Sequence, residues 1–129
     1  MSLQVWLPLD GNLKNQGLTT NISVVNNGAT INTNGKIGKC YCFENDSSYI
    51  TISKEAMNNF SDKASVCFWL KILSWNKEWA TFFQAGTNGT GWENYIFGFS
   101  RDGKTDKCCF TISHGSTSNG NNYKTPSLL

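Results

Sequence analysis

The chain has 129 residues, of which 16% are charged and 13% are aromatic, and its formal net charge is +2. Asn, Ser, Thr and Gly together make up 53 of these residues, a composition poor in strong helix formers that argues against a helical bundle. The basic residues form no run that could hold a nucleic-acid backbone, and no apolar stretch is long enough to cross a bilayer. We therefore expect one β-rich domain that neither binds nucleic acid nor inserts into a membrane.

Short apolar runs separated by Asn, Gly, Asp and Ser predict strands from the beginning of the chain onward. In the first half these strands are predicted at residues 5–9, 22–25, 29–31, 40–44 and 49–52. Turn signals at 26–28 and 45–48 each lie between two of these runs, and Asn-Gly between apolar runs favours a hairpin. We expect each turn to join the runs on its two sides into a hairpin. Ser53 is the predicted N-cap of a single helical turn at 54–59.

The second half of the chain continues the same pattern. Strands are predicted at residues 65–72, 80–85, 95–99 and 108–113. Strands that recur every 8–15 residues with turns between them indicate a β-sandwich or a barrel. From residue 114 onward Gly, Ser, Asn and Thr predominate. The predicted organisation is a β domain at 1–113 followed by a polar loop or tail at 114–129.

The five cysteines all lie within apolar strand-like runs, at positions 40, 42, 67, 108 and 109. Buried reduced thiols are the favoured interpretation, because a free cysteine behaves as a small hydrophobic residue. A disulfide and a metal site are the two alternatives. The C-x2-C spacing of a metal site is absent.

Titratable residues are too sparse to predict an active site. The single histidine, His114, lies in a polar stretch with no nucleophile or carboxylate predicted beside it. Glu44 and Asp46 are the one acidic pair two residues apart, but Asp46 falls in a turn. A glycosidase needs two carboxylates facing each other across a cleft, so a hydrolase is disfavoured. The sequence predicts a protein that is not an enzyme and has no catalytic or metal-binding residues.

Aromatic residues beside amides are the candidate ligand-binding residues. Trp75 and Trp79 bracket one short segment next to a predicted strand end, and Trp92 with Asn94 and Tyr95 form a second group. A sugar can stack on an indole while an amide or carboxylate binds its hydroxyls. The alternative is that these indoles close the ends of a sandwich. Both interpretations stay open at the level of the sequence.

Four segments in order resemble the concanavalin A-like, laminin-G-type jelly rolls of the lectin/glucanase superfamily, in particular those of bacteriophage and prophage structural proteins. The segments are residues 5–17, 35–43, 48–52 and 60–71, and the likeness covers residues 3 to about 113. The resemblance implies an all-β, two-sheet antiparallel jelly-roll sandwich. In such a fold Trp69 would fill the space between the sheets. Gly35 and Gly38 would flank a tight approach of two strands.

The resemblance also carries the expected function. It implies a non-catalytic, lectin-like binding module of a phage virion, in a tail, a fibre or a capsid decoration, that recognises glycan of the bacterial surface or of mucus. The alternative is a purely structural virion domain that contacts other virion proteins or forms a homo-oligomer, and a fragment of a glycoside hydrolase is the third. No signal peptide is visible, so we expect synthesis in the cytoplasm of the bacterial host and a place in the virion. No cofactor is expected; a rim calcium ion is suggested by the family alone.

The family usually continues for several strands beyond the point that corresponds to residue 129. The jelly roll is therefore expected to lack its C-terminal strands, which would expose sheet edges and apolar surface. Three explanations stay open: a shortened sandwich, a truncated product, or an edge completed by another chain.

Overall fold

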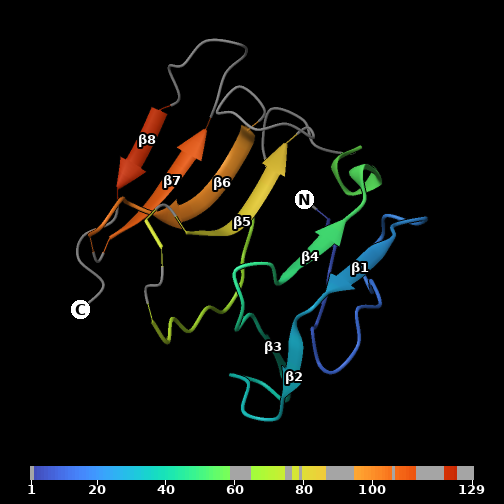
Figure 1. Cartoon of the computed structure of the whole chain (residues 1–129). Coiled ribbons are helices and arrows are strands. Elements are labelled where there is room, and N and C mark those ends of the chain that lie inside the picture. The colour runs from blue at the N-terminus through green and yellow to red at the C-terminus, as the bar shows by residue number, and fades with distance from the viewer. Residues whose placement is uncertain are drawn as a thin grey trace. The chain divides into compact units, whose positions relative to one another are not determined.

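The computed structural model describes residues 2–58, 65–74, 77–78, 80–86, 95–105, 107–112 and 121–124. Contacts divide the chain into two compact units, Met1–Leu70 and Lys71–Leu129, and every strand pair lies within one of them (Figure 1). All pairs are antiparallel. The predicted all-β class is therefore confirmed.

The first unit contains two two-stranded sheets. The strands are β1 (Val24–Asn27), β2 (Thr30–Asn32), β3 (Cys40–Cys42) and β4 (Tyr49–Ile52). β1 pairs with β4 and β2 pairs with β3, so the two predicted hairpins are wrong. The chain does not reverse at 26–28 but continues from β1 into β2, and it reverses between β2 and β3.

Hydrogen bonds of the Asn26 side chain explain why the Asn-Gly turn does not close a hairpin. Its amide nitrogen donates to the Ala29 carbonyl at 2.8 Å and its amide oxygen accepts from the Ala29 N–H at 2.9 Å. Gly28 adopts φ +80°, which a residue with a side chain rarely does. The side chain of Asn26 thus occupies the backbone groups of Ala29 that a paired strand would use.

The predicted helical turn is confirmed as a 3-10 turn, Lys54–Met57. Ser53 precedes it, as predicted, but its side chain makes no capping hydrogen bond to the backbone of the turn. Its hydroxyl accepts instead from the N–H of Ser23 at 3.1 Å, and its own N–H donates to the Ser23 carbonyl at 2.8 Å. Ser53 therefore continues the β1·β4 pairing by one more residue.

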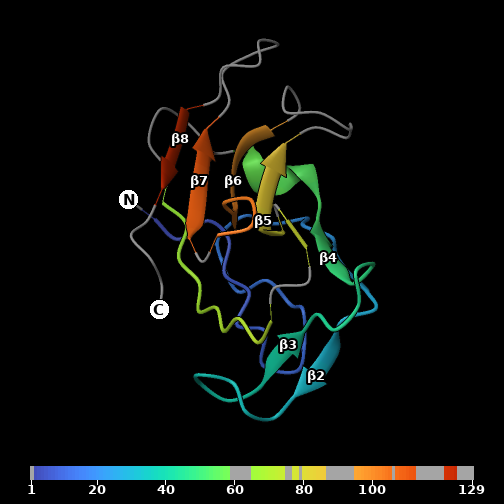
Figure 2. The same cartoon turned by 60° about the vertical axis from the view of Figure 1, so that its left-hand side comes forward.

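The second unit is a four-stranded sheet in the order β5-β6-β7-β8 (Figures 1 and 2). Its strands are β5 (Thr81–Gly86), β6 (Tyr95–Arg101), β7 (Cys108–Ile112) and β8 (Asn121–Lys124). The first three match predicted strands. β8 was not predicted: it lies within the range expected to be a polar loop or tail.

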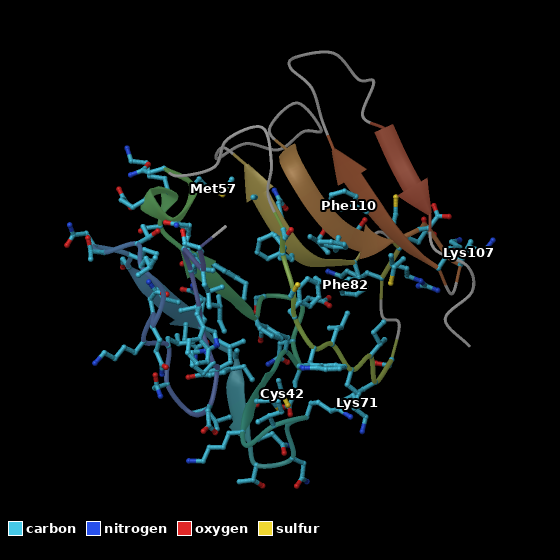
Figure 3. All side chains as sticks on the ribbon, turned by 180° about the vertical axis from the view of Figure 1, so that it is seen from behind. Cys42, Met57, Lys71, Phe82, Lys107 and Phe110 are labelled. Atoms are coloured by element: carbon cyan, nitrogen blue, oxygen red, sulfur yellow. The ribbon has the colours of Figure 1, made fainter. Side chains whose placement is uncertain are left out.

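Aromatic residues line up across this sheet. The register places Phe99 opposite both Phe83 and Phe110. The rings of Phe99 and Phe110 lie 4.8 Å apart, and Figure 3 shows Phe110 on the sheet. Next to the Phe99–Phe110 pair, Ser100 of β6 lies opposite Cys109 of β7, and both residues are buried. These cross-strand pairs fix the register of β6 against β7.

Two predicted strands are not strands in the structure. Residues 5–9 form no ladder, although the Trp6 carbonyl within them accepts from the Gln16 N–H and the Gln4 carbonyl just before them accepts from the Thr19 N–H. The run 65–72, the most apolar of the chain, has no strand assigned either. A β-prone sequence forms a strand only when a second segment satisfies its backbone groups.

Candidate functional site

The structure does not test the candidate site drawn from the sequence. Trp75, Trp79, Trp92 and Asn94 lie outside the described residues, and so does His114. The backbone of Tyr95 begins β6 opposite Gly86 of β5, and its side chain lies outside the described part. These residues stay candidate ligand-binding residues on the strength of the sequence.

Residues 65–73, called here the apolar segment, are the most unusual surface among the described residues. Large apolar side chains within it are exposed: Trp69 to 75%, Leu73 to 78%, and Phe68 and Leu70 to nearly half. The expectation that Trp69 fills the space between two sheets is therefore wrong. Figure 3 shows Lys71 on a stretch drawn as a plain trace, without an arrow. A continuous run of exposed apolar side chains is typical of surfaces that take part in binding.

A hollow of about 270 Å³ opens within this segment, lined by Cys67, Phe68 and Trp69. The ammonium group of Lys36 lies 5.4 Å from the centre of the Trp69 ring, within the range of a cation–π contact. Ile37, the next residue, is itself exposed. The site thus combines an indole, a phenyl ring and a thiol with one positive charge at its border.

The turn that carries Lys36 is held by two glycines and one carboxylate. The N–H of Gly35 donates to the Gly38 carbonyl at 2.9 Å, and Gly38 adopts φ +64°. Oδ1 of Asp10 accepts from the Lys39 N–H at 2.7 Å, and the same atom would lie 2.7 Å from a Cβ at Gly38. The close packing expected at Gly35 and Gly38 is present, but it lies within this turn and against the Asp10 side chain, not between two strands as predicted. Only glycine fits Gly38, because both its φ and its neighbour exclude a side chain.

The cysteines follow the prediction in part. All five are free thiols and Cys109 is buried, but Cys67 is exposed, which contradicts its predicted burial. Burial raises the pKa of the Cys42 thiol, and repulsion by Cys40 and a hydrogen bond with it raise this pKa further. Burial also raises the pKa of Cys108, with a smaller contribution from Cys109. Raised pKa values keep Cys42 and Cys108 protonated and weaken them as nucleophiles at neutral pH.

Two acidic residues of the described part make local contacts. Glu78 forms an ion pair with Lys104 at 2.8 Å. A hydrogen bond from Ser53 lowers the pKa of Glu55, which keeps that carboxylate ionised. Across the described ranges, no group of three or more His, Cys, Asp or Glu side chains could hold a metal ion. None of the helices in these ranges has the length and apolar character that crossing a membrane requires.

Comparison of the chain with protein-family models, with curated proteins and with solved structures finds no match. The jelly-roll likeness thus rests on the order of the four sequence segments alone.

Part of the hollow could be anticipated from the sequence. The alternation of the apolar segment and the two glycines of the neighbouring turn were both evident, but they predicted a buried strand. The proximity of Lys36 to Trp69 joins residues 33 positions apart, which periodicity does not report.

Proposed function

We propose that this chain is a non-catalytic assembly module that binds another polypeptide through the apolar segment. The observation that carries this proposal is the exposure of Trp69 and Leu73 within one continuous β-prone run. On the resemblance to bacteriophage structural proteins, we propose the virion of a bacteriophage as the assembly in which the module acts.

The chemistry of the apolar segment favours a peptide strand as the ligand. In an extended conformation its residues would alternate across two faces, and apart from Ser65 and Lys71 the side chains of both faces would be apolar, which is typical of a strand covered on both sides. A peptide strand supplies apolar side chains and also backbone donors and acceptors. A sugar needs polar partners around the indole. Lys36 is the one charged group recorded beside the Trp69 ring in the described residues.

A peptide array tests this function directly. Nine-residue peptides with alternating apolar residues are arrayed beside polar peptides of equal length, and the purified chain is applied. We expect retention on the apolar strands and loss of retention for the variant Trp69→Lys. The matched control is Lys14→Ala, a surface change in the first unit that leaves the apolar segment intact. Equal retention on polar and apolar peptides would contradict the proposal.

Glycan recognition is the second candidate, favoured by an exposed indole with an ammonium group 5.4 Å from its centre. It would use either this indole or the sequence candidates Trp75, Trp79, Trp92, Asn94 and Tyr95. A glycan array separates these choices. Binding that Trp92→Ala abolishes assigns the sequence candidates, and binding that Trp69→Ala abolishes assigns the hollow. An array without a signal above background removes this candidate.

A further inference from the structure

We propose that Cys40 and Cys42 form a two-thiolate site for a soft monovalent metal ion, and that Cu(I) is the ion that fits it. Both residues belong to β3, within the first unit, and the site uses no residue of the apolar segment. The inference therefore goes beyond the proposed function, and neither depends on the other.

Strand geometry places the two thiols side by side. Cys40 and Cys42 are the first and last residues of β3, and residues two apart on a strand point to the same face. Both are free thiols, and a hydrogen bond joins them. Both are half-buried, so an ion can reach them from solvent (Figure 3). The pair thus offers two neighbouring sulfur ligands at the surface of the first unit.

The pairing of β3 with β2 holds the spacing of the two thiols. Thr30 lies opposite Cys42 and Asn32 opposite Cys40, so both ends of β3 are fixed in the ladder. An extended strand rises about 3.2–3.4 Å per residue, which puts the two cysteine Cα atoms about 6.4–6.8 Å apart. A disulfide prefers a Cα separation of about 5.5–6 Å. The paired strand therefore disfavours a disulfide but allows an ion to lie between the two sulfur atoms.

The number and kind of ligands select the ion. Thiolates are soft donors, which favour Cu(I) over the hard cations that oxygen ligands bind. A structural zinc ion takes four ligands, and within the described ranges no group of three or more His, Cys, Asp or Glu side chains could supply them. Cu(I) has a filled d shell and binds two thiolates in a linear arrangement. Two thiols are thus a complete set of ligands for Cu(I) and half a set for zinc.

A metal ion between the sulfur atoms also removes their mutual repulsion. Burial raises the pKa of Cys42, and repulsion by Cys40 raises it further, because two neighbouring thiolates repel each other. One Cu(I) ion replaces the protons of both thiols: two S–H bonds break, two Cu–S bonds form, and both protons go to solvent. The copper stays Cu(I), so the step consumes no oxidant or reductant. The product is a dithiolate complex with one net negative charge.

Cys108 and Cys109 provide a comparison within the same chain. They are neighbours on β7, so their side chains point to opposite faces of the sheet, and Cys109 is 1% exposed. The two cannot both face one ion without a change in the strand. The chain thus carries one pair of thiols on a shared face and one pair on opposite faces.

Retention of copper against a chelator tests the site. The reduced chain is loaded with one equivalent of Cu(I) without oxygen, and bathocuproine disulfonate is added until its coloured Cu(I) complex forms. We expect the natural chain to need about tenfold more chelator, or above, than Cys40→Ser or Cys42→Ser. Cys108→Ser is the matched control, because it also removes one thiol and should retain copper like the natural chain. Equal retention by the natural chain and Cys42→Ser overturns the inference.

Moving one thiol to the other face of β3 tests the geometry. The double variant Tyr41→Cys with Cys42→Ser keeps five thiols but places those at 40 and 41 on opposite faces. We expect it to release copper as readily as Cys42→Ser alone, with circular dichroism showing that its β structure is kept. Retention at the level of the natural chain overturns the shared-face site.

X-ray absorption at the copper edge tests the ligand set without any substitution. The natural chain loaded with one equivalent of Cu(I) should show two sulfur neighbours around the copper. Three or more sulfur neighbours, or a shell of nitrogen and oxygen, overturns the two-thiolate site. Peptide mapping of the chain purified in air gives a further check, because a Cys40–Cys42 disulfide that glutathione does not reduce would also overturn it.

Discussion

At the scale of single residues, the thiols show how local surroundings divide chemically identical groups. Cys109 is 1% exposed, while Cys67 lies at the surface beside Trp69. Cys40 and Cys42 are two residues apart on β3, and the hydrogen bond between them confirms that they share a face, as predicted. Sequence spacing identified this pair, but it could not separate Cys67 from the buried thiols.

Alkylation as a function of pH should resolve these differences. We expect Cys42 and Cys108 to ionise above their usual pKa of 9.0, with burial as the main cause. Iodoacetamide labelling followed by peptide mass spectrometry gives the midpoint for each thiol. Cys40→Ala should lower the midpoint of Cys42 in part, because burial remains. A midpoint at or below 9.0 for Cys108 would contradict its environment.

The raised pKa values of Cys42 and Cys108 also determine how stability changes with pH. A thiol with a raised folded-state pKa keeps its proton where the unfolded chain has lost it. Its contribution is fully present below the unfolded-state pKa and is lost as the pH rises through the folded-state pKa. The free energy of unfolding should therefore fall above about pH 9. Urea unfolding of the chain and of Cys42→Ala with Cys108→Ala, which should show a smaller fall, measures this.

At the scale of elements, Arg101 fixes the connection between β6 and β7. Its guanidinium donates to three backbone carbonyls: Thr105 at 2.9 Å, Lys104 at 2.8 Å and Lys77 at 3.2 Å. The backbone N–H of Arg101 donates to the Ala80 carbonyl at 2.8 Å. The planar fork of an arginine reaches all three carbonyls at once, which a lysine cannot do.

Arg101→Lys should lower the free energy of unfolding by about 1–2 kcal/mol, because two or more of these hydrogen bonds are lost. Amide hydrogen exchange should quicken at Asp102 and Thr105, whose N–H groups bond within the same connection. Lys104→Ala is the control. It removes only an exposed ion pair with Glu78 and should cost well under about 1 kcal/mol. Equal effects of the two variants would contradict the role of the fork.

At the scale of the whole molecule, the fully buried apolar residues of the described part are small, and many of its large apolar side chains are exposed. Within the described ranges, the buried apolar residues are Ala29, Ala85 and Cys109, all of them small. Among the exposed large ones are Leu18, Ile37 and Trp69. Removing such side chains from water is the main source of stability in a protein of this size. Association that covers them should therefore stabilise the fold.

A dye that binds exposed apolar surface tests this expectation. Dilute protein should enhance the fluorescence of anilinonaphthalene sulfonate. Trp69→Lys combined with Leu73→Lys should reduce the enhancement. Absence of any enhancement in dilute solution would show that the apolar segment is covered within the single chain.

The sequence by itself determined the all-β class, three strands of the larger sheet and the 3-10 turn after Ser53. Each depends on residues close together in the chain, through period-two alternation or a turn signal. The tertiary structure decided that β1 pairs with β4, that polar residues form β8, and that Trp69 stands exposed beside Lys36. Strand pairing and burial depend on which distant segments meet. The alternation of apolar and polar residues predicts a strand but does not identify its partner.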